Sequence, residues 1–177
     1  MTGPLRLATA GADQTRALAG ALALLVVPGD VLLLAGDLGA GKTTFAQGFG
    51  AALGIEEPIT SPTFTLVREY PLGRPAPGPD AGHPVRTFFH ADVYRLDHLQ
   101  EIADLGLGQL VEDGGVALVE WGDAAEPLLG RGSLRVGLSA PGPDEGRRLV
   151  TVDAADRAWT GRRDALRTAL GAWMVPG

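Results

Sequence analysis

The first half of the chain combines apolar segments of helical and of strand length. Apolar side chains recur at helical spacing over residues 13–26, which predicts a helix with one buried face. The unbroken apolar run 31–35 has the length of a strand, and its lack of polar positions is typical of a strand covered on both faces. A glycine-rich segment follows. The helical pattern returns over residues 43–53, and Gly54 is a suitable stop.

Short apolar runs dominate the second half of the chain, and most have the length of strands. The Pro- and Gly-rich stretch 71–84 predicts an extended, exposed loop, and the two strands that it joins are expected to pair antiparallel. Two later runs flank the turn-rich residues 141–146 and predict a hairpin. The expected strands are 64–70, 85–91, 116–120, 134–139 and 148–152, with weak helical spacing at 99–105 and clearer helical spacing at 162–174.

This order of elements predicts an α/β fold in which helices flank a mixed sheet, with a β-hairpin and a helix at the C-terminal end. We find no internal repeat or linker, so residues 1–177 are expected to form one domain. The apolar stretch 21–27 is too short to span a bilayer, and the first residues lack the layout of a signal peptide. We therefore expect a cytoplasmic protein that makes no membrane contact.

Composition excludes several kinds of site. The chain has no Cys, which excludes disulfide scaffolds, thiol nucleophiles and Cys-ligated zinc or iron–sulfur clusters. Its three His are scattered along the sequence, which argues against a His-rich metal site. A net charge of -6 argues against a protein that coats the phosphate backbone of DNA or RNA, so any nucleic-acid role is expected to be indirect.

Residues 36–43 read Gly-Asp-Leu-Gly-Ala-Gly-Lys-Thr and match the phosphate-binding loop pattern. In such a loop, backbone N–H groups point inward at phosphates, and the start of the next helix adds the positive end of its dipole. Lys42 would place a compact ammonium on the outer phosphates, and the Thr43 hydroxyl would be a ligand for Mg²⁺. An accidental glycine turn would need neither the apolar strand before it nor the helix after it. The segment therefore predicts a nucleoside-triphosphate site.

Two carboxylates directly follow apolar runs. A triphosphate site needs an acid at the end of a neighbouring strand, where it holds the water shell of the metal or positions the attacking water. Glu120 follows the run 116–119 and fits the expected metal-side strand. Asp92 follows residues 87–91, and taken alone it is equally compatible with an ordinary surface charge at the end of a strand.

Three further features leave alternatives open. Residues 60–65 gather four hydroxyls around a proline; composition alone favours a solvated turn, but the position after the phosphate-loop helix is that of a switch segment. His90 is either a general base or, as is more usual beside a strand end, a structural residue. Trp121 either covers the site or packs in the core.

Lysine usage bears on the choice of nucleotide. The 15 Lys and Arg include a single lysine, Lys42. Guanine-specific NTPases of the Ras type read the base with Asn-Lys-x-Asp, and this chain has no second lysine with which to build that motif. ATP is therefore the expected nucleotide. The transporter signature LSGGQ is also absent, which argues against an ABC ATPase.

The blocks at residues 36–45, 61–67, 90–96 and 118–121 together resemble the TsaE (YjeE) family. That family is the ATPase component of bacterial tRNA threonylcarbamoyladenosine synthesis. The phosphate loop is common to many NTPases, but the four blocks in this order and spacing are specific. The likeness covers nearly the whole chain and weakens in the 71–84 loop and after about residue 131.

The resemblance implies a P-loop NTPase-like fold and a small Mg²⁺-dependent ATPase that supports turnover of a complex of TsaD and TsaB. TsaD transfers the threonylcarbamoyl group to the adenosine beside the anticodon, so this chain would act on tRNA only indirectly. Residues 12–15 would border the base. The implied catalytic residues are Lys42, Asp92 and Glu120; Thr43 and Glu120 would hold the metal; the nucleotide would be bound by Leu38, Gly39, Ala40, Gly41, Lys42, Thr43, Thr44, the switch residues Ser61 and Thr63, and Gly146 and Arg147.

Two other functions remain open at this stage. A small P-loop kinase would need an arginine-bearing lid after the middle of the sheet, where this chain predicts a hairpin. A nucleotide-dependent switch that only docks to partners would not need both Asp92 and Glu120. Because the chain shows no self-contained set of catalytic groups, we expect slow ATP hydrolysis by the isolated protein and faster hydrolysis with its partners.

Overall fold

The computed structural model describes residues 3–63, 65–74, 84–142 and 146–176. Seven strands form one mixed sheet in the order β1-β7-β6-β2-β5-β4-β3. The strands β6, β2, β5 and β4 run parallel, whereas β3, β7 and β1 are antiparallel to their neighbours. The strands are β1 (Leu5–Thr9), β2 (Val31–Ala35), β3 (Val67–Pro71), β4 (Thr87–Asp92), β5 (Gly115–Glu120), β6 (Leu134–Ser139) and β7 (Arg148–Asp153). The expected α/β fold with a mixed sheet is confirmed.

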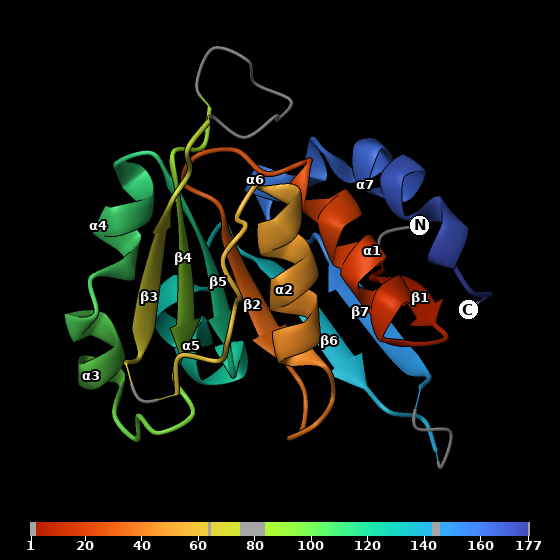
Figure 1. Cartoon of the computed structure of the whole chain (residues 1–177), viewed down its shortest axis with the longest axis horizontal. Helices are drawn as coiled ribbons and strands as arrows, with labels where there is room; N and C mark the ends of the chain where they lie inside the picture. The colour runs from red at the N-terminus through yellow and green to blue at the C-terminus, as the bar shows by residue number, and fades with distance from the viewer. Residues whose placement is uncertain (1–2, 64, 75–83, 143–145, 177) are drawn as a thin grey trace.

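Helices cover both faces of this sheet (Figure 1). One face packs against α1 and α2, and the other packs against α3, α4 and α5, so the molecule has two hydrophobic cores separated by the sheet. The strand β5 is buried at every position, which explains its unbroken apolar run. The helices are α1 (Ala12–Ala23), α2 (Lys42–Ala52), α3 (Leu99–Asp104), α4 (Leu107–Glu112), α5 (Gly122–Leu129), α6 (Arg157–Thr160) and α7 (Arg163–Leu170), and a 3-10 turn follows at Gly171–Trp173.

The carboxyl ends of the parallel strands meet at one edge of the sheet. The loop after β2 lies at this edge, and so do the last residues of β4 and β5, Asp92 and Glu120, which are register partners. The expected C-terminal hairpin is confirmed, because β6 and β7 pair antiparallel from Arg135 with Asp153 to Ser139 with Leu149. Since β6 is parallel to β2, the end of β6 and the start of β7 lie at the edge that carries the loop.

Several elements differ from the sequence pattern. The edge strand β1, the helix α5 and the short helix α4 were not predicted. Helix α1 ends at Ala23, three residues before the expected end, and the C-terminal helical segment divides into α7 and a 3-10 turn. The strands around the Pro-rich loop form the expected antiparallel pair, although β3 begins only at Val67. Residues 64, 75–83 and 143–145, which belong to the predicted strand 64–70 and to the two predicted turn segments, lie outside the described residues.

Within the described residues, every helix is too short or too polar to cross a membrane.

Candidate functional site

The loop between β2 and α2 is held close to the sheet by its glycines. A Cβ on Gly36 would lie 2.4 Å from the Leu138 carbonyl oxygen, which leaves no space for a side chain. Gly41 precedes α2 with a φ of 104°, a left-handed conformation that favours glycine. Helix α2 begins at Lys42, so its amino end faces the loop. This geometry gathers backbone N–H groups and the positive end of the helix dipole at one place.

A cavity of about 410 Å³ opens beside this loop. Its walls come from the loop, the first turn of α2, the segment 61–63 and the ends of β4, β5 and β7. The structure thus brings together most of the residues that the sequence singled out, from Leu38 to Trp121. The lining residues are Leu38, Gly39, Gly41, Lys42, Thr43, Thr44, Ser61, Thr63, Asp92, Tyr94, Glu120, Trp121 and Arg148.

Lys42 is folded back onto the loop and is only 5% exposed. Its Nζ donates to the carbonyl oxygens of Gly36 at 2.6 Å and Asp37 at 2.9 Å. Burial lowers the pKa of Lys42 from its usual 10.5, and the nearby carboxylates, Glu120 foremost, partly oppose this effect. The side chain is therefore a cation that has already lost much of its water and lies at the wall of the cavity.

Glu120 is the best-connected acid of the site. Its Oε1 accepts a hydrogen bond from Nε2 of His90 at 2.8 Å and another from the Thr43 hydroxyl at 3.3 Å. His90 is fully buried and Glu120 is 3% exposed, so the imidazole holds the carboxylate from its buried side. This contact assigns the proton to Nε2. His90 thus acts as a support for Glu120, in line with the structural alternative left open by the sequence.

Asp92 lies beside Glu120 and contacts the segment of hydroxyls. Its Oδ2 accepts hydrogen bonds from Ser61 at 2.8 Å and Thr63 at 3.2 Å, while Oδ1 accepts from the backbone N–H of Tyr94 at 2.9 Å. The 61–63 segment is therefore tied directly to a cavity carboxylate and is not merely a solvated turn.

Trp121 forms an aromatic wall of the cavity. Its ring lies 3.9 Å from the Nζ of Lys42, measured from the ring centroid, and 4.6 Å from the ring of Tyr94. The residue has a φ of 60°, unusual for a side chain of this size. A strained backbone that turns an indole toward the buried ammonium favours the site-covering alternative over simple packing in the core.

Two residues that line the cavity, Tyr94 and Arg148, were not among the residues that the sequence singled out, and Arg148 contacts the loop. Its Nε donates to the carbonyl oxygen of Ala40 at 2.9 Å and its Nη2 donates to that of Gly39 at 3.2 Å. The expected Gly146 and Arg147 do not line the cavity: a Cβ on Gly146 would lie 2.9 Å from the Ala10 carbonyl oxygen, beside the start of α1. Ala40 contributes its carbonyl to Arg148 without lining the cavity, and residues 12–15 are also outside the lining.

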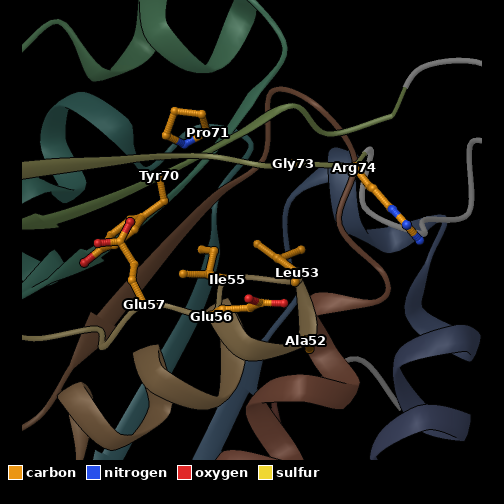
Figure 2. A pocket seen from close by; sticks show the side chains of 10 residues that line it. Ala52, Leu53, Ile55, Glu56, Glu57, Tyr70, Pro71, Gly73 and Arg74 are labelled. Carbon is orange, nitrogen blue, oxygen red and sulfur yellow. The ribbon is translucent and has the colours of Figure 1, made fainter.

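A larger cavity, of about 820 Å³, lies at the opposite end of α2 (Figure 2). It is bounded by the residues that follow α2 and by the end of β3, and it contains none of the predicted site residues. Its lining includes neither the loop after β2 nor the amino end of α2, the parts of the fold that offer backbone N–H groups to a phosphate. Its size therefore does not make it the nucleotide site.

The donor set beside α2 suits Mg²⁺ bound together with phosphate. Among the residues described, no three His, Asp or Glu side chains gather as a metal site. Mg²⁺ in nucleotide sites keeps several waters and takes few protein ligands, with the substrate phosphates supplying the others. The hydroxyl of Thr43 and the carboxylate of Glu120, 3.3 Å apart, meet that requirement.

The chain is similar to known proteins in sequence and in fold. Residues 9–149 match the family described as "Threonylcarbamoyl adenosine biosynthesis protein TsaE". The tRNA threonylcarbamoyladenosine biosynthesis protein TsaE of Bacillus subtilis is 41% identical over 150 residues, covering 85% of each chain, and that of Treponema pallidum is 34% identical over 84% of this chain and 99% of the relative. The crystal structure of Bacillus subtilis YdiB superposes with a TM-score of 0.74 at 33% identity, covering 95% of this chain and 97% of that one. The chain therefore belongs to the TsaE family.

Proposed function

We propose that the cavity beside α2 binds ATP with Mg²⁺ and hydrolyses the ATP, and that this hydrolysis serves the formation of threonylcarbamoyladenosine in tRNA. The observation that carries the proposal is the meeting of a buried Lys42 with two adjacent carboxylates, Asp92 and Glu120, around one cavity. A site that only held a phosphate would not need two acids beside its cation. The family to which the chain belongs supplies the connection to tRNA modification.

The phosphates would lie against the loop and the amino end of α2. Backbone N–H groups there donate to phosphate oxygens, and Lys42 would exchange its contacts with the Gly36 and Asp37 carbonyls for the outer phosphates. Thr43 and Glu120 would hold Mg²⁺, which neutralises charge on the phosphates when it is bound. His90 keeps the Glu120 carboxylate in place.

Asp92 is proposed to orient the attacking water. Its carboxylate is buried at 3% exposure yet lines the cavity, so it can accept a proton or a hydrogen bond from a water that lies there. Ser61 and Thr63 now donate to the same carboxylate, which makes the 61–63 segment the part of the chain that would respond to the outer phosphate.

ATP is the proposed nucleotide, because the single lysine of the chain is already used in the loop. The proposed partners are TsaD and TsaB, with tRNA contacted only indirectly, and the proposed compartment is the cytoplasm. Because these partners are absent from the isolated protein, we expect its hydrolysis to be slow and the assembled complex to be faster.

Phosphate release tests this proposal when it is measured with Mg-ATP, with and without TsaD, TsaB and tRNA. Stimulation by the partners and its loss in Asp92→Ala would support the proposed mechanism. Lys42→Arg keeps the charge but replaces the compact ammonium with a planar guanidinium, so hydrolysis should also fall strongly. Equal rates with and without partners, or unchanged hydrolysis in Asp92→Ala, would contradict the proposal; phosphorylation of small metabolites would indicate a kinase.

A further inference from the structure

The hairpin β6–β7 places one arginine against the outside of the phosphate loop. In β7 the side chains of Arg148, Val150 and Val152 share one face of the strand, and the two valines are buried in the core beneath α1 and α2. Arg148 is the first residue of the strand and lies at the same edge of the sheet as the loop after β2. Its side chain therefore extends from the core face directly onto the loop.

Three nitrogens of this guanidinium donate to backbone carbonyls. Nε and Nη2 donate to Ala40 and Gly39 of the loop, and Nη1 donates to the carbonyl of Arg147 at 2.8 Å. Two adjacent peptide units of the loop are thus held by one planar, rigid cation. Lysine could not reproduce this arrangement, because its ammonium is a point charge without a fixed fork of donors.

Because the peptide bond is planar, a contact that fixes a carbonyl of the loop also fixes the direction of the N–H in the same peptide unit. In a trans peptide the C=O and the following N–H point in opposite directions. Holding the Gly39 carbonyl fixes the Ala40 N–H, which closes a turn on the Asp37 carbonyl at 3.0 Å. Holding the Ala40 carbonyl fixes the Gly41 N–H so that it points away from the guanidinium. Gly41 lines the cavity, and its N–H would be a donor to a phosphate bound there.

We propose that Arg148 is a positioning residue that preorganises the phosphate loop for nucleotide binding, a role that rests on the proposed function of the cavity. It acts through the backbone of Gly39, Ala40 and Gly41 and not by contact with the outer phosphate. Loop N–H groups cradle the phosphates that ATP and ADP share. Loss of Arg148 should therefore weaken both nucleotides by the same factor, whereas an arginine that touched the γ-phosphate would affect ATP alone.

Isothermal titration of the full chain with Mg-ATP and with Mg-ADP tests this role. Arg148→Met keeps the aliphatic stem and removes the donors, and we expect roughly tenfold weaker binding of both nucleotides. Arg148→Lys should remain weakened. Arg135→Ala, which removes an exposed arginine of the adjacent strand that pairs with Glu126, is the matched control and should bind like the wild type. In amide NMR spectra, the Gly41 signal should shift in Arg148→Met.

The outcomes separate the two proposals. If the wild-type chain binds neither nucleotide, the proposed function fails. If the wild type binds and Arg148→Met binds equally well, or if Arg148→Lys restores full affinity, the positioning role fails. A loss confined to ATP would also overturn it, and so would a loss in Arg147→Ala with none in Arg148→Met.

Discussion

Gly48 of α2 lies against the backbone of Arg16 in α1, and adding one methyl group there should destabilise the protein. A Cβ on Gly48 would lie 2.2 Å from the carbonyl oxygen of Arg16 and 2.4 Å from its Cα. Ordinary contacts of this kind begin at about 3.4 Å, so the two helices would have to separate by about 1 Å. The opposing atoms belong to the backbone, so no change of rotamer can relieve the overlap.

Two effects of Gly48→Ala have opposite signs. Alanine inside a helix is favoured over glycine by roughly 0.5–1 kcal/mol. Overpacking a well-packed contact costs roughly 1–3 kcal/mol, and the upper end applies here because both contacting groups are fixed by their helices. We therefore expect a net loss of about 2 kcal/mol, which for a chain of this size lowers Tm by about 4–8 °C.

Thermal and urea unfolding measure this loss, and Gly108→Ala is the matched control. Gly108 lies in α4, is exposed, and would place its Cβ within 4 Å of nothing. The same substitution should there be neutral or stabilise by up to about 1 kcal/mol, because only the helix propensity changes. If Gly48→Ala proves as stable as the wild type, the close helix crossing is not the constraint described here.

Substitutions at three further residues probe buried polar and charged groups. Between the lowered pKa of Lys42 and its usual 10.5, the unfolded chain binds more protons than the folded chain, so the free energy of unfolding should rise with pH. Urea unfolding at several pH values should show a smaller rise in Lys42→Met. An equal rise in both proteins would contradict burial as the cause of the lowered pKa. His90→Leu removes the donor that lies 2.8 Å from the Glu120 carboxylate and should lower the free energy of unfolding, measured in urea, by about 3 kcal/mol. His90→Gln should lower it less, and equal losses in the two variants would argue against the hydrogen bond. Asp30→Asn weakens the two hydrogen bonds that Arg162 donates to Asp30 at 2.6 and 2.7 Å, and it should also lower the free energy of unfolding by about 3 kcal/mol. An unchanged urea midpoint would refute this expectation.

The parts of the fold that sequence predicts are those in which local pattern and tertiary burial agree. β2 and β5 are buried on both faces, so their apolar runs are uninterrupted, and the loop glycines occupy positions that their backbone requires. β1 alternates buried and more exposed side chains over only five residues near the start of the chain, a weak signal before its partner is known. α5 contains Pro127, and that residue type ordinarily argues against a helix interior.

The site shows the same division between local and distant information. The motif around Lys42 is contiguous and carries its own structural requirements, so its position can be read from the sequence. Arg148 reaches a loop carbonyl 108 residues away, and only the parallel pairing of β6 with β2 brings its strand there. The strand pattern does place Arg148 on the core face with Val150, which is the one signal that could have pointed to it.

The role of the chain in tRNA modification is tested most directly by counting the threonylcarbamoyladenosine formed per TsaD molecule. The reaction would contain TsaD, TsaB, tRNA, a threonylcarbamoyl donor and Mg-ATP, with the wild-type chain, with Lys42→Arg or with no added chain. We predict repeated rounds of modification with the wild type, and an early stop both without the chain and with Lys42→Arg. The same number of rounds in all three mixtures would contradict the proposed function.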